Sequence, residues 1–292
     1  MRRATVRSLV LIGVLLLAGC GSSTSGNGVS SDTTTFAYPR GANDLVLSIT
    51  SGGGLLAPQA VFSQLPMITV TGDGRVITTG PQIAIYPQPA MPNLRQQVLT
   101  PTGVQAVLNA AQDAGLLQSN PSFGRPPVAD APTTTFTVVV GAGRFVSDVY
   151  ALGMESGGTT ADLSNDDLRH RQQLIAFERK MTDLSAWLGP EVGPDTAYTV
   201  IKLAALVREV PADWTDPSGV QPNKLDWPLG DLAAVKDTGA GKVVVVEGGD
   251  LDTLRPLLSQ ATQITLWRSG GATYQLTFRP VLPGEVDLPG VS

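Results

Sequence analysis

Residues 65–78 read LPMITVTGDGRVIT, and this stretch shows the sequence pattern from which we predict the fold of much of the chain. Two runs rich in apolar and β-branched residues flank Asp73-Gly74, and glycine accepts the positive φ that a tight turn between strands requires. The stretch therefore predicts an antiparallel β-hairpin. Just before it, residues 44–50 (DLVLSIT) alternate apolar and polar side chains, which predicts another strand.

Two further glycine-centred hairpins are predicted by the same pattern. Residues 133–140 (TTTFTVVV) are followed by a glycine turn and a returning run at 144–152, and residues 263–267 and 273–278 flank Ser-Gly-Gly. Residues 242–247 (KVVVVE) are typical of a buried strand. Residues 196–210 fit either a strand followed by a helix or one long strand.

Three helices are expected between these strands. Thr100 followed by Pro101 marks a helix start, and apolar residues recur after it at three- and four-residue steps. Asp250 is expected to cap a helix that extends through Ala261.

The longest helix is predicted over residues 165–188, with Ser164 as its N-cap and Gly189-Pro190 as its end. Its apolar stripe predicts a buried face, and Arg169 and Arg171 lie off that stripe. The stripe consists of Leu168, Leu174, Phe177, Met181, Leu184 and Leu188.

These patterns predict an α+β fold in which antiparallel β-hairpins pack on a few amphipathic helices. The end of the longest helix is the clearest candidate boundary, so we expect two similar-sized α+β halves, 36–189 and 190–292. The 32 glycines and 22 prolines favour many turns and short elements.

The N-terminus has the layout of a secretory signal peptide. Three arginines among the first seven residues precede an apolar run at 9–17, which is shorter than the roughly 20 residues that span a bilayer. Leu17-Ala18-Gly19 then precede Cys20, the only cysteine of the chain. This junction resembles the lipobox of bacterial lipoproteins, and the chain resembles uncharacterised actinobacterial lipoproteins in its general composition.

The lipobox resemblance implies where the protein goes. Residues 1–19 would be a signal peptide, and Cys20 would carry a thioether-linked diacylglyceryl group with acyl chains such as palmitate on the new N-terminus. Residues 20–35 contain mainly small and polar side chains and are expected to be a flexible tether. The expected location is the outer face of the cytoplasmic membrane.

Composition and motifs argue against several kinds of chemistry. The formal net charge of −5 argues against nucleic-acid binding. His170 is the only histidine and lies between two arginines, so neither a Ser-His-Asp triad nor a Cys/His zinc site is expected. No cofactor or metal is expected.

Carboxylates remain as candidates for general acid–base chemistry. Asp73 lies in a predicted turn, several acidic residues at 162–167 lie at a predicted helix start, and Glu247 and Asp250 flank a strand-to-helix turn. Each position also has an ordinary structural explanation in turn formation, the helix dipole or helix capping.

The aromatic residues Trp267 and Tyr274 lie on the two arms of one predicted hairpin, with Arg268 beside them. Stacked rings next to a guanidinium group suit the binding of a sugar or peptide. Cross-strand packing in a core would place the same two rings together, so both interpretations stay open.

The sequence favours a membrane-anchored, non-catalytic binding protein whose partner is an envelope protein or a cell-wall component. One alternative is a carboxylate-dependent hydrolase of an envelope polymer. The other is a solute-binding lipoprotein, although the chain contains few of the βαβ units that such proteins require.

Overall fold

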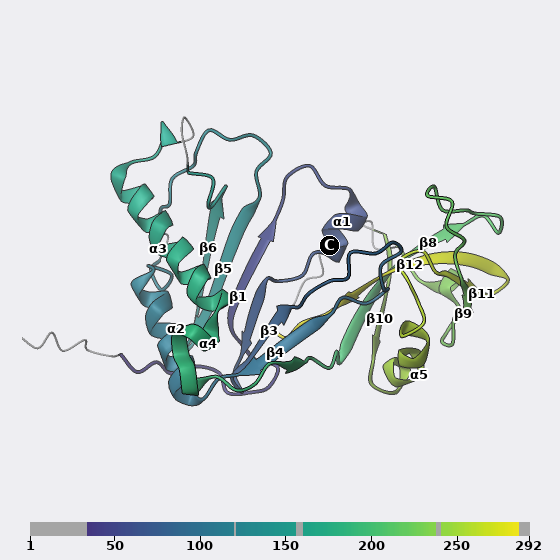
Figure 1. Ribbon diagram of the computed structural model, residues 1–292, viewed down its shortest axis with the longest axis horizontal. Helices are drawn as coiled ribbons and strands as arrows, with labels where there is room; N and C mark the ends of the chain where they lie inside the picture. The colour runs from purple at the N-terminus through teal and green to yellow at the C-terminus, as the bar shows by residue number, and fades with distance from the viewer. Residues whose placement is uncertain (1–33, 120, 156–159, 238–240, 286–292) are drawn as a thin grey trace, which may run out of the picture. The chain divides into compact units, whose positions relative to one another are not determined.

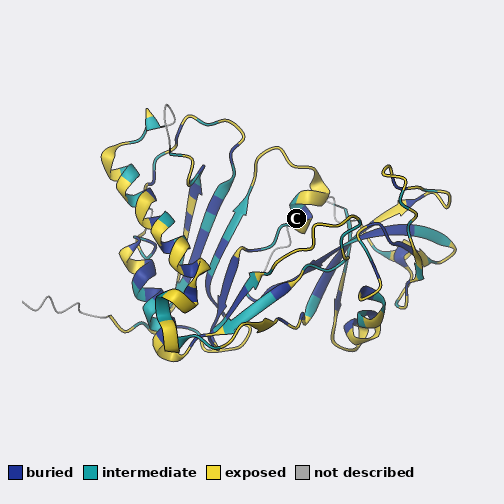
Figure 2. Cartoon of the chain, in the orientation of Figure 1, coloured by how far each residue is buried: buried dark blue, intermediate teal, exposed yellow. Residues whose placement is uncertain are grey.

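A computed structural model describes residues 34–119, 121–155, 160–237 and 241–285, which belong to one compact unit. It contains two largely antiparallel sheets and the helices that cover them, and this confirms the α+β class (Figure 1). Buried residues concentrate along the strands and on the inward sides of the helices (Figure 2).

The first sheet has seven strands, each antiparallel to its neighbours. The predicted hairpins at 65–78 and 133–152 are confirmed, with Asp73-Gly74 at the first turn. From one edge to the other the strands are β6 (Gly143–Tyr150), β5 (Thr133–Val140), β1 (Leu45–Gly52), β2 (Ile68–Thr71), β3 (Arg75–Thr79), β4 (Leu94–Val98) and β7 (Thr196–Ala197).

Three helices cover one face of this sheet: α2 (Pro101–Asp113), α3 (Asn165–Thr182) and α4 (Leu184–Leu188). Strand alternation directs Ile49, Phe136 and Val138 into the core with them, and each fully buried side chain of this kind contributes about 1.5–3 kcal/mol. The expected caps are present, since Thr100 accepts a hydrogen bond from the Gly103 amide and Ser164 forms a capping box with Asp167.

The long helix predicted over 165–188 is divided in two, which corrects the sequence prediction. Asp183 leaves helical geometry, with φ −134° and ψ 66°, and its carboxylate accepts from the Ala186 amide to cap α4. Aspartate competes with the helical backbone in this way. Arg171 was expected off the apolar stripe, but its side chain is fully buried.

The second sheet has five strands and is covered by α5 (Gly248–Leu258). The hairpin predicted around Ser269 is confirmed, and the ambiguous stretch 196–210 becomes β7 and a separate long strand. In spatial order the strands are β10 (Lys242–Glu247), β8 (Lys202–Val210), β12 (Ala272–Pro280), β11 (Leu266–Ser269) and β9 (Lys224–Asp226), and β9 alone runs parallel to its neighbour.

Two local predictions in this region are wrong. Residues 242–247 form an edge strand rather than a buried one, and Val245 is 45% exposed there. Glu247, not Asp250, occupies the N-cap of α5, and Asp250 lies in the first helical turn, where its charge complements the helix dipole.

The two sheets meet around α1 (Pro58–Ser63), a short helix between β1 and β2 that the sequence pattern did not predict. Phe62 of α1 is buried with Ala204 of β8 and with Val281, just after β12. A second small cluster joins Ile77 and Leu94 of the first sheet to Leu282. The predicted boundary near Gly189 stays a prediction, and β7, which follows it, belongs to the first sheet.

Candidate functional site

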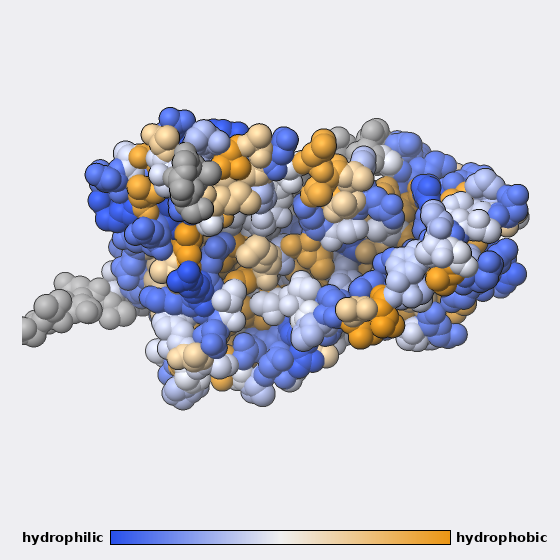
Figure 3. Space-filling view, turned by 45° about the horizontal axis from the view of Figure 1, so that its top comes forward, coloured by the Kyte–Doolittle hydropathy of each residue, from blue (hydrophilic) through white to orange (hydrophobic). Residues whose placement is uncertain are grey.

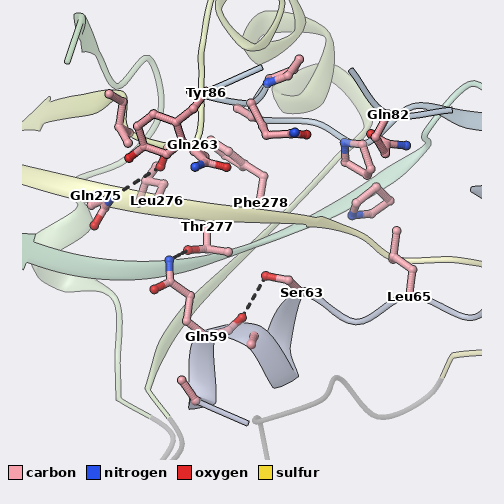
Figure 4. Close-up of a pocket in the computed structure, with 18 of the residues that line it drawn as sticks. Gln59, Ser63, Leu65, Gln82, Tyr86, Gln263, Gln275, Leu276, Thr277 and Phe278 are labelled. Atoms are coloured by element: carbon pink, nitrogen blue, oxygen red, sulfur yellow. Dashed lines mark hydrogen bonds between the residues drawn. The ribbon is translucent and has the colours of Figure 1, made fainter. Parts of the chain in front are cut away.

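A cavity with a volume of about 670 Å³ lies where α1 faces β12. Figure 4 shows the side chains that line it. One wall is α1, a second is β12, and the third is the proline-rich loop 82–92 that precedes β4. We call this cavity the α1–β12 groove.

A hydrogen bond holds α1 against β12. The side-chain amide of Gln59 donates to the Thr277 hydroxyl over 2.5 Å, and Ser63 donates to the main-chain carbonyl of Gln59 over 2.8 Å (Figure 4). With Phe62 buried beneath the helix, these contacts fix the α1 wall.

A buried ion pair ties the end of α1 to the end of β12. Arg279 is 1% exposed, and its Nε donates to the carbonyl of Gln64, the residue after α1, over 3.0 Å. Its two terminal nitrogens donate to the two carboxylate oxygens of Glu285. Glu285 in turn accepts from the Leu282 amide, so the guanidinium group joins α1, β12 and the turn at 282–285.

The third wall is held at one end by main-chain pairing. The Ala90 amide donates to the Ala261 carbonyl over 3.0 Å, and the Gln263 amide donates to the Gln88 carbonyl over 2.9 Å. Loop 82–92 is therefore attached to the segment before β11 and not to β12. The Tyr86–Pro87 peptide bond in this loop is cis.

One edge of β12 is left open inside the groove. Val281 donates to the Lys202 carbonyl, and the alternation of an antiparallel ladder then directs the main-chain groups of Thr277 and Arg279 toward β8. The main-chain groups of Phe278 point the other way, where the pairing of β11 with β12 has already ended at Leu266 and Gln275. Among the described residues, no main-chain hydrogen bond to Phe278 is found on that side.

The groove is lined almost entirely by uncharged side chains. Asp216 is the one charged residue that the described chain contributes to its lining. Five glutamines contribute amides, and together with Ser63, Thr277 and Tyr86 they give the walls both donors and acceptors. The glutamines are Gln59, Gln82, Gln88, Gln263 and Gln275.

The single carboxylate of the groove already has partners. Asp216 accepts from the Ser218 amide over 2.9 Å and from the Ser218 hydroxyl, and Tyr86 also hydrogen-bonds to it. These hydrogen bonds, that from Ser218 first, lower the pKa of Asp216. The same contact raises the pKa of Tyr86, because the ionised phenol would face a carboxylate.

Exposed apolar residues border the groove on two sides. Leu55 and Leu56, which directly precede the α1 wall, are 93% and 44% exposed. Ile83 and Ile85, on the loop wall, are 57% and 58% exposed. Figure 3 shows that hydrophobic residues reach the surface in several separate areas of the molecule.

The aromatic pair predicted from the sequence lies in the core. Trp267 and Tyr274 face each other across β11 and β12, but they are 0% and 1% exposed, and the Trp267 ring packs edge-on against Trp227 and Phe278. Arg268 is exposed and forms an ion pair with Asp226. Neither ring offers a face to a ligand, so the burial favours the core-packing interpretation.

The candidate carboxylates are scattered. Asp73 forms an ion pair with Arg75 in the hairpin turn, and Asp167 belongs to the capping box of α3. Glu247 forms an ion pair with Lys202, whose Nζ lies 3.4 Å from Oε2 of the carboxylate. His170 lies edge-on to Phe123, with ring centroids 6.5 Å apart. In the described part of the chain, no group of three or more metal-ligating side chains is close enough to hold an ion.

Leu17, Ala18, Gly19 and Cys20 lie outside the described residues, so lipidation stays a prediction. The described chain begins beside α2, where Asn109 donates to the Thr34 carbonyl and Gln105 exchanges two hydrogen bonds with the main chain of Phe36. Within the described ranges, the helices are all too short or too polar to cross a membrane.

Comparison of the chain with protein-family models, with curated proteins and with solved structures finds no match. The site must therefore be interpreted from its own geometry.

Sequence reasoning did not find the groove. Its lining comes from segments that are distant in the chain, namely residues 57–65, 82–92, 216 and 263–280, and glutamine, proline and alanine carry no motif. The pattern of four prolines at 81–92 correctly predicted an extended loop, which was the one local signal of a groove wall.

Proposed function

We propose that the protein is an exported lipoprotein, anchored through Cys20 to the outer face of the cytoplasmic membrane, that binds an envelope component in the α1–β12 groove without catalysis. The observation that carries the binding site is the groove itself, which has a volume of about 670 Å³ and walls of uncharged hydrogen-bonding side chains. Cavities of this size with a few placed polar groups are the usual ligand sites of proteins.

The polarity of the groove supports binding rather than hydrolysis. A carboxylate-dependent hydrolase needs a general acid and a second carboxylate on either side of the scissile bond. Asp216 is the single carboxylate of the groove in the described chain, and its oxygens already accept hydrogen bonds.

The anchor supports a role next to the membrane. The first described residues dock on α2, so the thirteen residues 21–33 would separate the lipid from the folded body. A flexible chain of that length has a typical reach of about 20 Å, from roughly 5–6 Å times the square root of its length. The groove would then meet partners close to the membrane surface or in the adjacent cell wall.

Site-directed photocrosslinking in a bacterium that processes lipoproteins tests this proposal. A photoreactive amino acid replaces Gln82, which lies exposed on the groove wall, or Gln172, which is exposed on α3 away from the groove. We expect light-dependent adducts from position 82 and not from position 172. We also expect Cys20→Ser to move the protein out of the membrane fraction and to reduce the adducts.

Two results would contradict the proposal. Equal adducts from both positions, or none from position 82, would mean that the groove is not the binding site. Unchanged membrane attachment of Cys20→Ser would mean that the lipid anchor is wrong.

A further inference from the structure

We propose that the occupant of the α1–β12 groove is an extended, uncharged peptide segment of another protein, which adds to the open edge of β12 as an antiparallel or parallel strand. This inference rests on the proposed function, because it names the class of ligand for the same groove.

The open edge provides the main-chain pairing that strand addition requires. On one side β12 is paired with β8 as far as Pro280, whereas on the other side its pairing with β11 ends at Gln275. On the β11 side, the main chain from Leu276 to Pro280 therefore has no neighbouring strand, and at about 3.3 Å per residue it offers roughly 16 Å of edge.

The residues of this edge line the groove through their main chain. Leu276, Phe278 and Pro280 belong to the lining, yet the side chains of Leu276 and Phe278 pack into the core with Trp267 and are 3% and 6% exposed. Buried main-chain donors and acceptors are costly when unpaired. An incoming strand would supply partners to the Phe278 amide and carbonyl.

The walls restrict the edge to a single strand. An exposed sheet edge would otherwise pair with any other edge, including that of a second copy of the chain. Here α1 lies on one side and loop 82–92 on the other. A hydrogen bond fixes α1 to β12, and main-chain hydrogen bonds fix the loop to the segment before β11. A thin, extended chain fits between such walls, and a preformed sheet does not.

The side chains of the groove set the chemistry of the segment. No lysine or arginine side chain lines it in the described chain, so an acidic segment finds no counter-charge. Asp216 is already engaged by Ser218 and Tyr86, so a basic segment gains little there. The exposed Leu55, Leu56, Ile83 and Ile85 at the borders favour apolar side chains on the segment where it leaves the groove.

Backbone N-methylation tests the pairing directly. The probe is a panel of fluorescein-labelled heptapeptides that alternate valine with serine, threonine or glutamine, titrated against the full-length protein in detergent and followed by fluorescence anisotropy. We expect saturable binding by members of the panel. Because alternate amides of a strand point to opposite sides, methylation of one alternating set of amides should weaken binding at least tenfold, and methylation of the other set should change it less than threefold.

A matched pair of variants locates the site. Ala60 is exposed on α1 and lines the groove, and Ala186 is exposed on α4, another short helix. Ala60→Trp should weaken peptide binding at least tenfold, whereas Ala186→Trp should leave it unchanged, with the thermal unfolding midpoint of both variants checked first. Hydrogen exchange over residues 275–280 should slow when the peptide binds.

The outcomes separate this inference from the proposed function. Failure of the whole panel to bind, or equal loss from both methylation patterns, overturns strand addition. Binding of N-acetylglucosamine oligomers in place of the peptides, blocked by Ala60→Trp, would overturn the peptide class but leave the groove as the site. Loss of the groove-specific crosslinks described above would overturn the proposed function itself.

Discussion

Replacing Arg279 by methionine should strongly destabilise the protein, because this arginine joins three segments through a buried charge. Its guanidinium group binds the Gln64 carbonyl, the Pro280 carbonyl at 3.2 Å and the carboxylate of Glu285. Methionine has a similar length and no charge, so the substitution removes these hydrogen bonds and keeps most of the packing volume.

The magnitude follows from what the substitution leaves behind. The side chain of Glu285 is 14% exposed, so its carboxylate would stay largely buried without its counter-charge. Removing one partner of a buried ion pair costs about 3–5 kcal/mol. Since a domain is stable by about 5–15 kcal/mol, Arg279→Met should remove a large fraction of the free energy of unfolding.

Urea unfolding followed by tryptophan fluorescence measures the effect, with buried Trp267 in the same sheet as a probe. Arg268→Met is the matched control, because Arg268 lies in the neighbouring strand and its ion pair with Asp226 is exposed. That variant should lose less than about 1 kcal/mol.

A double variant separates the orphaned charge from the lost contacts. Arg279→Met combined with Glu285→Leu removes both charges and should recover at least about 1 kcal/mol relative to Arg279→Met alone. If Arg279→Met lost less than about 1 kcal/mol, or the double variant were no more stable than the single one, the buried ion pair would not hold the α1–β12 junction.

Three other perturbations follow from contacts elsewhere in the fold. Arg171→Met should cost about 3–5 kcal/mol in urea unfolding, because the buried guanidinium pairs with the carboxylate of Glu155, whose side chain is only 12% exposed. Arg169→Met, which removes an exposed ion pair, should change the free energy of unfolding by no more than about 0.5 kcal/mol. Asp216→Asn should bring the pKa of Tyr86 back toward its ordinary value, as measured by an NMR titration of the tyrosine-labelled protein. In the parent protein, the stabilisation that Tyr86 contributes should be complete below about pH 10 and should be lost as the pH rises through the raised pKa. Burial and the neighbouring carboxylate of Glu155 raise the pKa of Glu178. The free energy of unfolding should therefore fall as the pH rises through this raised pKa, and in unfolding measured from pH 4 to 7 Glu178→Gln should make the fall smaller.

Local signals predicted the elements whose ends are set by local chemistry. Gly74 adopts φ +88° in the first hairpin turn, and its main chain lies so close to Leu99 that any side chain would clash. Thr100 and Ser164 cap their helices through their own side chains. In each case a few neighbouring residues contain the whole cause, so the sequence pattern is sufficient.

Elements that depend on distant partners were not predictable in this way. Strand β4 reads LRQQV, which lacks the alternation and the β-branched residues of a strand, and it exists because β3 pairs along its whole length. Arg171 carries a charge that sequence patterns place at the surface. Its burial depends on carbonyls of Phe123, Tyr150 and Ala151, which only the folded chain brings to it.

The candidate site is the extreme case of this dependence. The open edge of β12 exists because β11 begins only at Leu266, opposite Gln275, while the segment before Leu266 pairs with residues 88–90 instead. No residue marks that point in the sequence, since the strand pattern continues through 276–280 as though a neighbour were present.

Two buried arginines connect these findings to function. Cys20 is the only cysteine, so no disulfide can form within the chain, and irregular segments must be fixed by other means. Arg171 and Arg279 each bind main-chain carbonyls and a carboxylate through one buried guanidinium group. At Arg279 this fixes α1 and β12 before any ligand arrives, so a bound segment would not have to order the walls of the groove. Because pre-ordered sites spend less free energy on reorganisation, the same ion pair that stabilises the fold should also strengthen binding, and Arg279→Met should weaken peptide affinity even in molecules that remain folded.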